Sequence, residues 1–368
     1  PMLTGDFAGS FATWLLRALT FLIVSCPCAL VVSVPLAFFG GIGAASKAGI
    51  LIKGSSYMDA LAKADTVVFD KTGTLTKGVF EVTTLHPEEM DEKELLHLAA
   101  HVERYSTHPI AVSLRTAFGN EADGCTVESV EEVAGQGIRA VVNGRTVCVG
   151  NSKMMDAIGA KWKSCDEAGT IIHVAVDGVY AGHIHISDIE KPDARKAIAE
   201  LKALGVGHTV MLTGDREEVA KRVASDLGLD EYHAELLPAD KVSGVEQLLQ
   251  NRKEGASLVF VGDGINDAPV LARADIGVAM GAMGSDAAIE AADVVLMDDQ
   301  PSKIAKAVRI SRSTLAIAKQ NIVFAIAVKV GILILAAFGL APMWLAVFGD
   351  TGVLILCVLN SMRALKAR

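Results

Sequence analysis

The sequence predicts an α/β protein that is joined to membrane-spanning helices. Long apolar segments lie near both ends of the chain, and a mixed-polarity middle section lies between them. This middle section alternates short apolar runs with helical patterns, which indicates a parallel sheet. Hydrophobic residues make up 51% of the 368 residues and aromatics only 5%. The excess is therefore aliphatic, as in lipid-facing helices, and the mean hydropathy of +0.39 is high for a soluble enzyme.

The net charge and the cysteine content further limit the class of protein to which the chain can belong. The formal net charge of −9 argues against a nucleic-acid-binding protein, which usually has a basic face. Six cysteines in a chain of this length do not indicate a disulfide framework. Cys125, Cys148 and Cys165 are scattered through the middle section and are interpreted as ordinary small thiols. The chain starts at Pro1 without a signal-peptide layout, so we expect a cut end there.

The apolar segments have membrane length. The first, 18–46, contains no charged residue and exceeds the roughly 20 residues that span a bilayer. The last two, 322–341 and 343–362, contain one charge each. Basic residues cluster beside these segments at Lys47 and Lys53, at Lys303, Lys306, Arg309 and Arg312, and at Arg363, Lys366 and Arg368. By the positive-inside rule these clusters are cytoplasmic, so we expect a cytoplasmic middle section and a C-terminal membrane hairpin.

The middle section has the pattern of a parallel α/β sheet. Apolar runs that predict strands are 66–69, 210–212 and 257–261, and helical patterns cover 193–204 and 217–227. The stretch from 77 to 187 differs, because short strands at 138–142, 146–149 and 171–176 accompany only one or two helices. We interpret it as an inserted domain. His183 and His185 alternate there as on one face of a strand, with metal ligation as the alternative.

The polar residues that follow the predicted strands form a candidate phosphoryl-transfer site. Ligands of parallel sheets bind at the carboxyl ends of the strands, and Asp70 lies at such an end. Its carboxylate can attack phosphorus, and the transfer needs charge neutralisation more than acid–base chemistry. Backbone groups can come from Thr72 and Gly73, phosphate contacts from Thr213 and Lys241, and Mg²⁺ ligands from Asp263 and Asp267. Each element alone has an ordinary explanation, but three strand ends together indicate catalysis.

Three motifs carry a resemblance to a known family. The runs Asp-Lys-Thr-Gly-Thr-Leu-Thr at 70–76, Thr-Gly-Asp at 213–215 and Gly-Asp-Gly-Ile-Asn-Asp-Ala-Pro at 262–269 resemble the signature motifs of P-type ATPases. That family belongs to the haloacid-dehalogenase-like superfamily. The resemblance implies an α/β Rossmannoid phosphorylation domain, an inserted α+β nucleotide-binding domain and transmembrane α-helices. It also implies ATP and Mg²⁺ as ligands and an aspartyl-phosphate at Asp70.

The resemblance further implies residue roles and domain limits. It implies catalytic roles for Asp70, Lys71, Thr72, Thr213, Gly214, Asp215, Lys241, Asn266 and Asp267. It implies Mg²⁺ binding by Asp70, Thr72 and Asp263. We expect a transmembrane helix with a cytoplasmic extension at 1–58, the phosphorylation domain at 59–76 and 188–302, the nucleotide-binding domain at 77–187, and the transmembrane hairpin at 303–368.

A second set of residues in the inserted domain concerns the nucleotide. His108-Pro109 follows a helical pattern, and Gly135-Gln-Gly137 opens a strand. The pair is similar to the His-Pro and Gly-x-Gly elements of heavy-metal-transporting P-type ATPases. Those elements hold adenine through an imidazole and through close backbone approach, for which glycine is suited. Glu103 matches the acidic adenine contact of that family.

The first apolar segment contains a candidate metal site. Cys26-Pro27-Cys28 lies within it, and Pro27 cannot donate a backbone hydrogen bond, so the helix should break there. Thiolates are ligands for soft or borderline cations. Two small buried core residues are the ordinary alternative. A Cys-Pro-Cys at this place resembles the transition-metal subgroup of P-type ATPases.

The last two apolar segments bear on the identity of the metal. Lys329 and Asp350 are ionisable residues inside membrane-length runs, which is costly and points to function. An aspartate beside two thiolates favours a divalent ion over Cu⁺. Both segments are similar to those of Zn²⁺/Cd²⁺/Pb²⁺ exporters, whereas copper pumps carry a Tyr-Asn pair and a Met-x-x-Ser-Ser element. We therefore interpret Cys26, Cys28 and Asp350 as ligands of the transported ion and Lys329 as their counter-ion.

The sequence thus predicts an ATP-driven exporter of Zn²⁺, Cd²⁺ or Pb²⁺ in a bacterial plasma membrane. A Cu⁺ pump and a membrane-anchored phosphatase of the same superfamily are the alternatives. P-type ATPases also have an actuator domain with a Thr-Gly-Glu loop, and Thr4-Gly5-Asp6 is not that motif. We expect the actuator domain and earlier helices upstream in the full-length protein, as partners of this segment, and no complete transport cycle without them.

Overall fold

The computed structural model describes residues 7–106, 108–120, 123–165, 169–263, 267–281 and 286–366. The chain divides into two compact units. The first contains residues 1–69, 196–210 and 238–368, and the second contains residues 70–195 and 211–237. The boundaries fall inside two strands, at Asp70 and Met211, and inside one helix, at Lys196, so the predicted domain limits remain a prediction.

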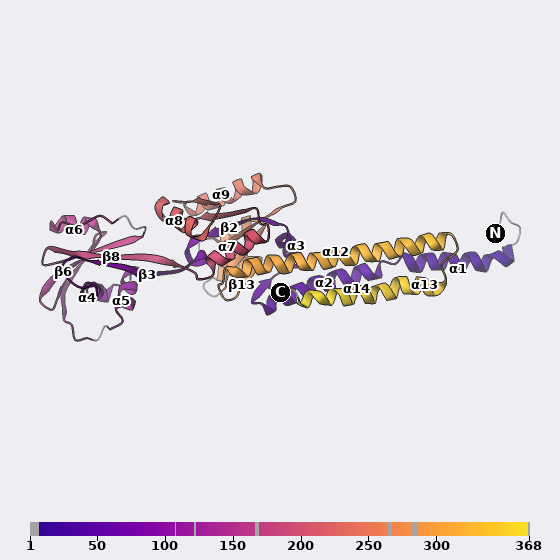
Figure 1. Ribbon diagram of the computed structural model, residues 1–368, viewed down its shortest axis with the longest axis horizontal. Helices are drawn as coiled ribbons and strands as arrows, with labels where there is room; N and C mark the ends of the chain where they lie inside the picture. The colour runs from indigo at the N-terminus through magenta and orange to yellow at the C-terminus, as the bar shows by residue number, and fades with distance from the viewer. Residues whose placement is uncertain are drawn as a thin grey trace. The chain divides into compact units, whose positions relative to one another are not determined.

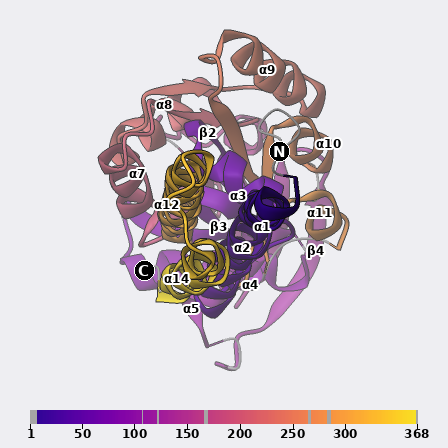
Figure 2. The same ribbon diagram turned by 90° about the vertical axis from the view of Figure 1, so that its right-hand side faces the viewer.

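Apolar helices form a bundle in the first unit. Its members are α1 (Phe7–Ser25), α2 (Cys28–Lys47), α12 (Ser302–Ala337), α13 (Met343–Val347) and α14 (Val353–Ser361). The segments Phe11–Lys47, Ser302–Ala337 and Met343–Lys366 are long and apolar enough to cross a membrane. Helices α2, α12 and α14 run side by side (Figure 1) and are neighbouring columns when viewed along their axes (Figure 2). Large side chains such as Leu22 and Phe338 stay exposed on the bundle, as expected for surfaces that face lipid.

The predicted helix break is confirmed. Helix α1 ends at Ser25, and α2 begins at Cys28. Pro27 precedes α2 and lacks the amide hydrogen that a continuous helix would need. The membrane-length apolar run 18–46 is therefore divided between two helices.

A largely parallel sheet forms the rest of the first unit. Its strands are, in spatial order, β1 (Ile50–Ile52), β13 (Val294–Leu296), β12 (Ile276–Met280), β11 (Ser257–Gly262), β2 (Ala64–Asp70), β9 (His208–Leu212) and β10 (Glu231–His233), the last of which belongs to the second unit. Strands β2, β11, β12 and β13 are parallel, and β1 is an antiparallel edge. Phe69 and Phe260 are fully buried in its core. The helices that belong with it are α3 (Ser55–Ala62), α7 (Ala194–Ala203), α9 (Pro238–Asn251), α10 (Ala268–Arg273) and α11 (Asp286–Ala291).

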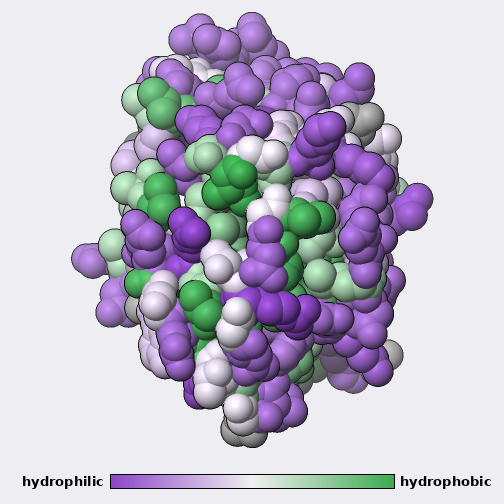
Figure 3. Space-filling model, turned by 90° about the vertical axis from the view of Figure 1, so that its left-hand side faces the viewer, coloured by the Kyte–Doolittle hydropathy of each residue, from purple (hydrophilic) through white to green (hydrophobic). Residues whose placement is uncertain are grey.

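The second unit is built on an antiparallel sheet. Its strand order is β3 (Thr76–Pro87), β8 (Val179–Glu190), β7 (Thr170–Val176), β6 (Arg145–Gly150), β5 (Gly137–Val142) and β4 (Val127–Val133). Helices α4 (Glu92–Val102) and α5 (Pro109–Phe118) pack on one face, where Leu95, Leu98 and Leu114 join the core. Helix α6 (Ser152–Ile158) packs on the other face through Met154 and Met155. The face of the second unit that is seen in Figure 3 is mostly hydrophilic.

The second unit also contains the segment after β9. Helix α8 (Glu217–Leu227) covers the predicted helical pattern residue for residue and is followed by β10 (Glu231–His233). The predicted strands at 138–142, 146–149 and 171–176 lie within β5, β6 and β7. The prediction of an α/β sheet with an inserted α+β part is confirmed, because alternating patterns and turn glycines mark most of these elements.

Candidate active site and membrane metal cluster

The first candidate site lies at the carboxyl edge of the parallel sheet. Strands β2 and β11 pair in parallel with Phe69 opposite Val261. Asp70 directly follows Phe69, and Asp263 lies two residues after Val261. Both acids therefore leave the sheet where ligands of parallel sheets bind. The strand register, and not only the sequence motif, therefore supports this edge of the sheet as a ligand-binding site.

Two carboxylates and a lysine surround the end of β11. Asp263 and Asp267 each offer an oxygen, and these atoms lie within 4.8 Å of one another. Lys241 Nζ on α9 lies 3.0 Å from Asp267 Oδ1, and Asp267 is only 1% exposed. A Cβ at Gly262 would lie 2.8 Å from Asp267 Oδ2, so a larger residue there would displace the Asp267 carboxylate. Such hard oxygen donors fit Mg²⁺. The predicted site residue Asn266 lies outside the described residues.

The residues after Asp70 form a tight turn. Gly73 has φ of 73°, a left-handed conformation that favours glycine. Lys191 Nζ donates to the carbonyl oxygen of Gly73 at 2.7 Å. Thr72 is exposed and Lys71 is buried. The turn therefore directs Thr72 to solvent and Lys71 to the interior.

Lys71 contacts two acids in the second unit. Its Nζ pairs with Asp215 and lies 3.9 Å from Asp188 Oδ2. Asp188 accepts hydrogen bonds from Thr76 Oγ1 and, at 3.0 Å, from the amide of Gly78. Burial raises the pKa of Asp188, although these donors and Lys71 oppose the shift. Asp188 and Lys191 were missed by the sequence analysis; their signal was a carboxylate and a lysine at the end of the strand that contains His183 and His185.

The Thr-Gly-Asp segment follows β9. Thr213 is buried, and its hydroxyl accepts a hydrogen bond from the amide of Asp215 at 3.1 Å. The amide of Thr213 donates to the carbonyl of His233 at 3.0 Å, which ties the segment to β10. Gly214 is exposed. The segment thus presents Gly214 to solvent on a turn that these two hydrogen bonds hold.

The predicted nucleotide contacts lie at the junction of α4 and α5. Glu103 is 8% exposed, and burial raises the pKa of its carboxyl group, with a contribution from Glu132. Arg115 donates to the carbonyl oxygens of Glu103 and Ser106 at 2.7 and 2.8 Å. His108 caps α5, because its Nδ1 accepts from the amide of Ile110 at 3.3 Å. The structure therefore orders Glu103 and His108 on one short connection.

The two glycines between β4 and β5 have different constraints. Gly135 has φ of 73° and open space at its Cβ position. Gly137 has φ of 152°, and a Cβ there would lie 2.2 Å from the carbonyl oxygen of Val149. Gly137 is therefore required by the pairing of β5 with β6 whether or not a nucleotide binds, whereas Gly135 is available to approach a ligand.

The histidines of β8 have other partners. His183 stacks on His86 at 4.7 Å, and Tyr180 Oη lies 3.1 Å from His183 Nδ1. His185 Nδ1 lies 2.6 Å from Thr83 Oγ1. Within the described part of the chain, neither His183 nor His185 joins a group of three metal-ligating side chains. These contacts favour the interpretation of both residues as parts of a packed sheet.

The second candidate site lies inside the helix bundle. Cys26 and Cys28 flank the break between α1 and α2, and Asp350 comes from a π-helical turn, Phe348–Gly352, between α13 and α14. One ligand atom from each of these three residues lies within 4.8 Å of the others. Such π-turns occur often at functional sites. The arrangement brings two sulfurs and a carboxylate to one place.

The two cysteines are joined by a disulfide bond. The cysteine count predicted no disulfide framework, and this one bond between two near neighbours does not amount to a framework. Two cysteines that are separated by one residue across a broken helix can reach each other, and the same closeness suits a shared metal ion. The thiolate, not the disulfide, is the metal ligand, so ion binding requires the reduced pair.

Lys329 completes this cluster from α12. Its Nζ lies 3.2 Å from Asp350 Oδ1 and donates to the carbonyl oxygens of Val24, at 3.2 Å, and Cys26. These carbonyls are available because a helix end leaves its last acceptors unpaired. Lys329 is 8% exposed. The break at Pro27 therefore creates the acceptors that hold a buried ammonium group beside Asp350.

The comparisons with known proteins agree on one family. A family model described as haloacid dehalogenase-like hydrolase matches residues 64–275. The chain is 56% identical, over 98% of its length, to a cadmium, zinc and cobalt-transporting ATPase of Bacillus subtilis (strain 168). A crystal structure of a zinc-transporting PIB-type ATPase in the E2.Pi state is 39% identical and superimposes over 98% of this chain with a TM-score of 0.87.

Coverage differs between these relatives. The chain spans 51% of the Bacillus protein and 59% of the zinc-transporting ATPase, so it is about half as long as the curated relatives it matches. The structure of a catalytic CPx-ATPase domain, CopB-B, in a study of nucleotide binding, is 30% identical with a TM-score of 0.56. That match covers 72% of this chain and 96% of the other.

Proposed function

This chain belongs to the haloacid dehalogenase-like hydrolases and, within them, to the metal-transporting P-type ATPases, and we propose that it is the catalytic and ion-gating part of a bacterial zinc- and cadmium-exporting pump. Pb²⁺ and Co²⁺ belong to the same proposed cargo class. The phosphorylation domain would comprise 59–76 and 188–302, and the nucleotide-binding domain 77–187. The observation that carries the cargo proposal is the convergence of Cys26, Cys28 and Asp350 within the membrane-length helices.

We propose Asp70 as the nucleophile. One of its carboxylate oxygens forms a bond to the γ-phosphorus of ATP, the bond from that phosphorus to the β–γ bridging oxygen breaks, and ADP leaves. Asp70, Thr72 and Asp263 are suited to hold Mg²⁺, with Asp267 beside them, and the ion would supply charge neutralisation when bound. Lys241 already neutralises Asp267 at 3.0 Å, so this edge can tolerate the extra charge of a phosphate.

The cargo proposal rests on ligand chemistry. Two thiolates and a carboxylate form a mixed set that suits Zn²⁺ and Cd²⁺ better than Cu⁺, which prefers all-soft ligands. When the ion is absent, Lys329 can balance Asp350, because the two groups lie 3.2 Å apart. When the ion binds, it takes over the charge of Asp350, and the ammonium of Lys329 keeps the carbonyls of Val24 and Cys26. Release would reverse this exchange.

One helix gives the proposed coupling a physical route within the first unit. Helix α12 extends without interruption from Ser302 to Ala337 and carries both Arg312 and Lys329. Arg312 donates to the carbonyl oxygens of Ala62, at 3.1 Å, Ala64, at 3.1 Å, and Leu204. The carbonyl of Ala64 begins strand β2, that of Ala62 ends helix α3, and that of Leu204 directly follows helix α7. A change at the parallel sheet can therefore shift the helix that holds Lys329.

The nucleotide proposal rests on the junction of α4 and α5. Glu103, His108 and the exposed turn at Gly135 would contact adenine through a carboxyl group, an imidazole and a bare backbone. Gly137 would contribute through the strand pairing that fixes this turn. Burial raises the pKa of the Glu103 carboxyl group, so this group takes up a proton more readily than an exposed glutamate does.

The decisive experiment uses the full-length protein in reduced form. Zn²⁺ or Cd²⁺ should stimulate ATP hydrolysis, and Cys26→Ala or Asp350→Ala should abolish this stimulation, because each removes a ligand. Cys148→Ala is a matched control, since this buried thiol lies in the second unit. Unchanged stimulation in both ligand variants would overturn the transport proposal and leave a phosphatase with membrane anchors. Stimulation by Cu⁺ alone would replace the zinc class with a copper pump.

The rest of the protein is part of the proposal. The relatives are about twice as long as this chain, which is consistent with an actuator domain and further helices in the same protein. We propose that these parts hydrolyse the aspartyl-phosphate and complete the ion path. Accordingly, residues 1–368 alone should bind nucleotide but should not move Zn²⁺ into vesicles.

A further inference from the structure

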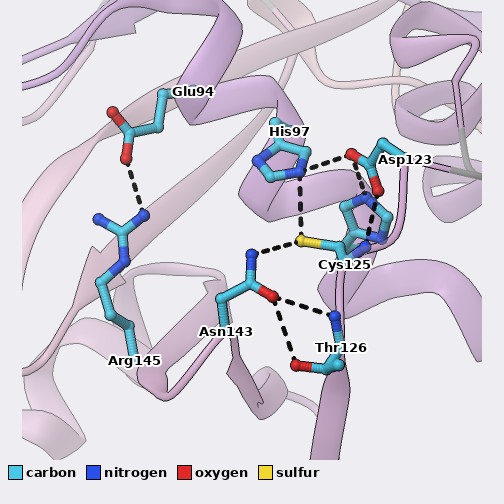
Figure 4. A network of polar contacts seen from close by, with 8 residues as sticks. Glu94, His97, Asp123, Cys125, Thr126, Asn143 and Arg145 are labelled. Atoms are coloured by element: carbon cyan, nitrogen blue, oxygen red, sulfur yellow. Dashed lines mark hydrogen bonds and ion pairs between the residues drawn. The ribbon is translucent and has the colours of Figure 1, made fainter.

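A second group of metal-ligating side chains lies in the second unit, away from the residues used above. Helix α4 carries His97 and His101, one turn apart, so their side chains share a face. Asp123 and Cys125 precede β4. One ligand atom from each of the four residues lies within 4.8 Å of the others. Two imidazoles, a carboxylate and a thiol therefore meet at one point (Figure 4).

The distances in this group resemble those of a tetrahedral metal site. His97 Nε2 lies 2.8 Å and His101 Nε2 3.1 Å from the same oxygen, Asp123 Oδ2. Cys125 Sγ lies 3.4 Å from His97 Nε2. Zinc bonds of roughly 2.0–2.3 Å at tetrahedral angles put ligand atoms about 3.3–3.8 Å apart. An expansion of about 0.5 Å would therefore convert the hydrogen-bonded group into a coordination shell.

A surrounding set of polar contacts orients the sulfur. Asn143 Nδ2 donates to Cys125 Sγ at 2.8 Å, and Asn143 Oδ1 accepts from the amide of Thr126 at 3.0 Å. Asn143 has φ of 50° and forms, with Gly144, the two-residue turn between β5 and β6. A donor that is fixed by its own backbone turn stabilises a thiolate, and such outer contacts tune metal sites.

The carboxylate is held in the same way. Asp123 Oδ1 accepts from the amide of Cys125 at 3.1 Å, so Oδ2 is directed to the histidines. Burial would raise the pKa of Asp123, but the amide of Cys125 and the side chains of His101 and His97 lower it overall. The side chains of His97 and Asp123 are 23% and 20% exposed, so an ion can enter from solvent.

We propose that His97, His101, Asp123 and Cys125 form a closed four-coordinate site for a divalent ion of the zinc class in the nucleotide-binding region. The mixed nitrogen, oxygen and sulfur donors suit Zn²⁺, Cd²⁺ or Co²⁺ and disfavour the hard ions Mg²⁺ and Ca²⁺. Four protein ligands leave no open position, so the site is structural or regulatory and not hydrolytic. The proposal does not depend on the transport function.

The position of this site suggests what an ion there would do. His101 lies two residues before Glu103, the predicted nucleotide contact. Asp123 and Cys125 belong to the connection between α5 and β4. An ion would therefore tie this connection to the end of α4 and stabilise the second unit when metal is abundant.

The test uses the chain with Cys26→Ser and Cys28→Ser, which removes the two thiolate ligands of the membrane site. After chelation, this variant should bind one Co²⁺ per chain with the visible bands of tetrahedral cobalt and a near-ultraviolet thiolate-to-cobalt charge-transfer band, and Zn²⁺ should displace the cobalt. Adding Cys125→Ser should abolish the charge-transfer band. Cys165→Ser, a partly buried free thiol in the same unit, is the matched control and should leave the band unchanged.

A second measurement guards against a folding defect. Without metal, the Cys125→Ser variant and its parent should unfold at similar temperatures, because serine can still accept from Asn143. With excess Zn²⁺, the parent should gain several degrees and the Cys125→Ser variant much less. The proposal is overturned if the parent shows no charge-transfer band, or if the band and the Zn²⁺ stabilisation persist after Cys125→Ser.

Discussion

The edge of the parallel sheet and the cluster in the helix bundle both contain buried charged side chains. The two regions differ in what surrounds these charges. At the edge, charged groups are numerous and neutralise one another, although most of them are buried: Lys241 pairs with Asp267, and Lys71 pairs with Asp215 near Asp188. In the bundle, Lys329 and Asp350 are a single pair among apolar helices. Removal of one charge at the edge should change chemistry, whereas removal of one in the bundle should also cost stability.

The largest expected effect is at the edge. Asp70→Asn in the full-length protein should reduce the acid-stable phosphoenzyme formed from labelled ATP to background, because the amide is not a nucleophile. Zn²⁺ binding should be retained, because the membrane ligands are untouched. Asp65→Asn is the control, since Asp65 lies on the same strand but pairs with Lys253 at 3.1 Å. Phosphoenzyme formation in the Asp70 variant would remove Asp70 from its proposed role.

The bundle should respond through stability as well. Lys329→Met leaves Asp350 without its cation, and breaking a buried pair in this way costs about 3–5 kcal/mol. We expect a lower unfolding temperature in detergent, and partial recovery when Asp350→Asn is added. Lys319→Met, at an exposed position of the same helix, should have little effect. If Lys329→Met is as stable as the parent, the pair does not stabilise the bundle.

His173 extends the comparison, because it is a buried ionisable side chain whose pKa is shifted by burial and not by an opposite charge. His173 is 4% exposed, and burial, with His183 nearby, lowers its pKa from 6.5 to about 4. The unfolded chain therefore binds a proton near pH 6.5 that the folded protein does not. Stability should fall as the pH drops from 6.5 towards 4, by up to about 3 kcal/mol at 1.36 kcal/mol per pKa unit.

Thermal unfolding between pH 7 and pH 4 checks this expectation. His173→Gln should flatten the decline in stability, because glutamine does not titrate. His233→Gln is the matched control, since His233 is exposed and its loss should change the slope little. An equally steep decline in the His173 variant would assign the acid sensitivity to other groups.

The smallest expected effect concerns the link between the two regions. Arg312→Ala removes hydrogen bonds to three carbonyl oxygens, and a charged hydrogen bond contributes about 1.5–3 kcal/mol. We expect a stability loss of about 2 kcal/mol and a several-fold weaker metal stimulation of ATP hydrolysis, with Zn²⁺ and ATP affinities retained. Arg309→Ala, at an exposed position one turn away, should leave the stimulation intact. Equal stimulation in both variants would exclude Arg312 from coupling.

The sequence by itself located three candidate site residues at the ends of strands. Asp70, Thr213 and Asp263 each follow an apolar strand run, and parallel strands bring their carboxyl ends to one edge wherever they fall in the chain. Pro27 likewise predicted the helix break, because a missing amide hydrogen acts locally. Such features depend on chain neighbours or on the general rules of a sheet, so no coordinates were needed.

Only the tertiary structure decided the remaining contacts. It placed Asp188 beside Lys71, tied Arg312 to three backbone carbonyls, and aimed Lys329 at the carbonyls that the helix break exposes. It also brought Cys125, predicted to be an ordinary thiol, next to His97. These partners are far apart in the chain, and a side chain's type and spacing do not state which distant group it will meet. Packing of helices and strands makes that choice, because it alone fixes their register and separation.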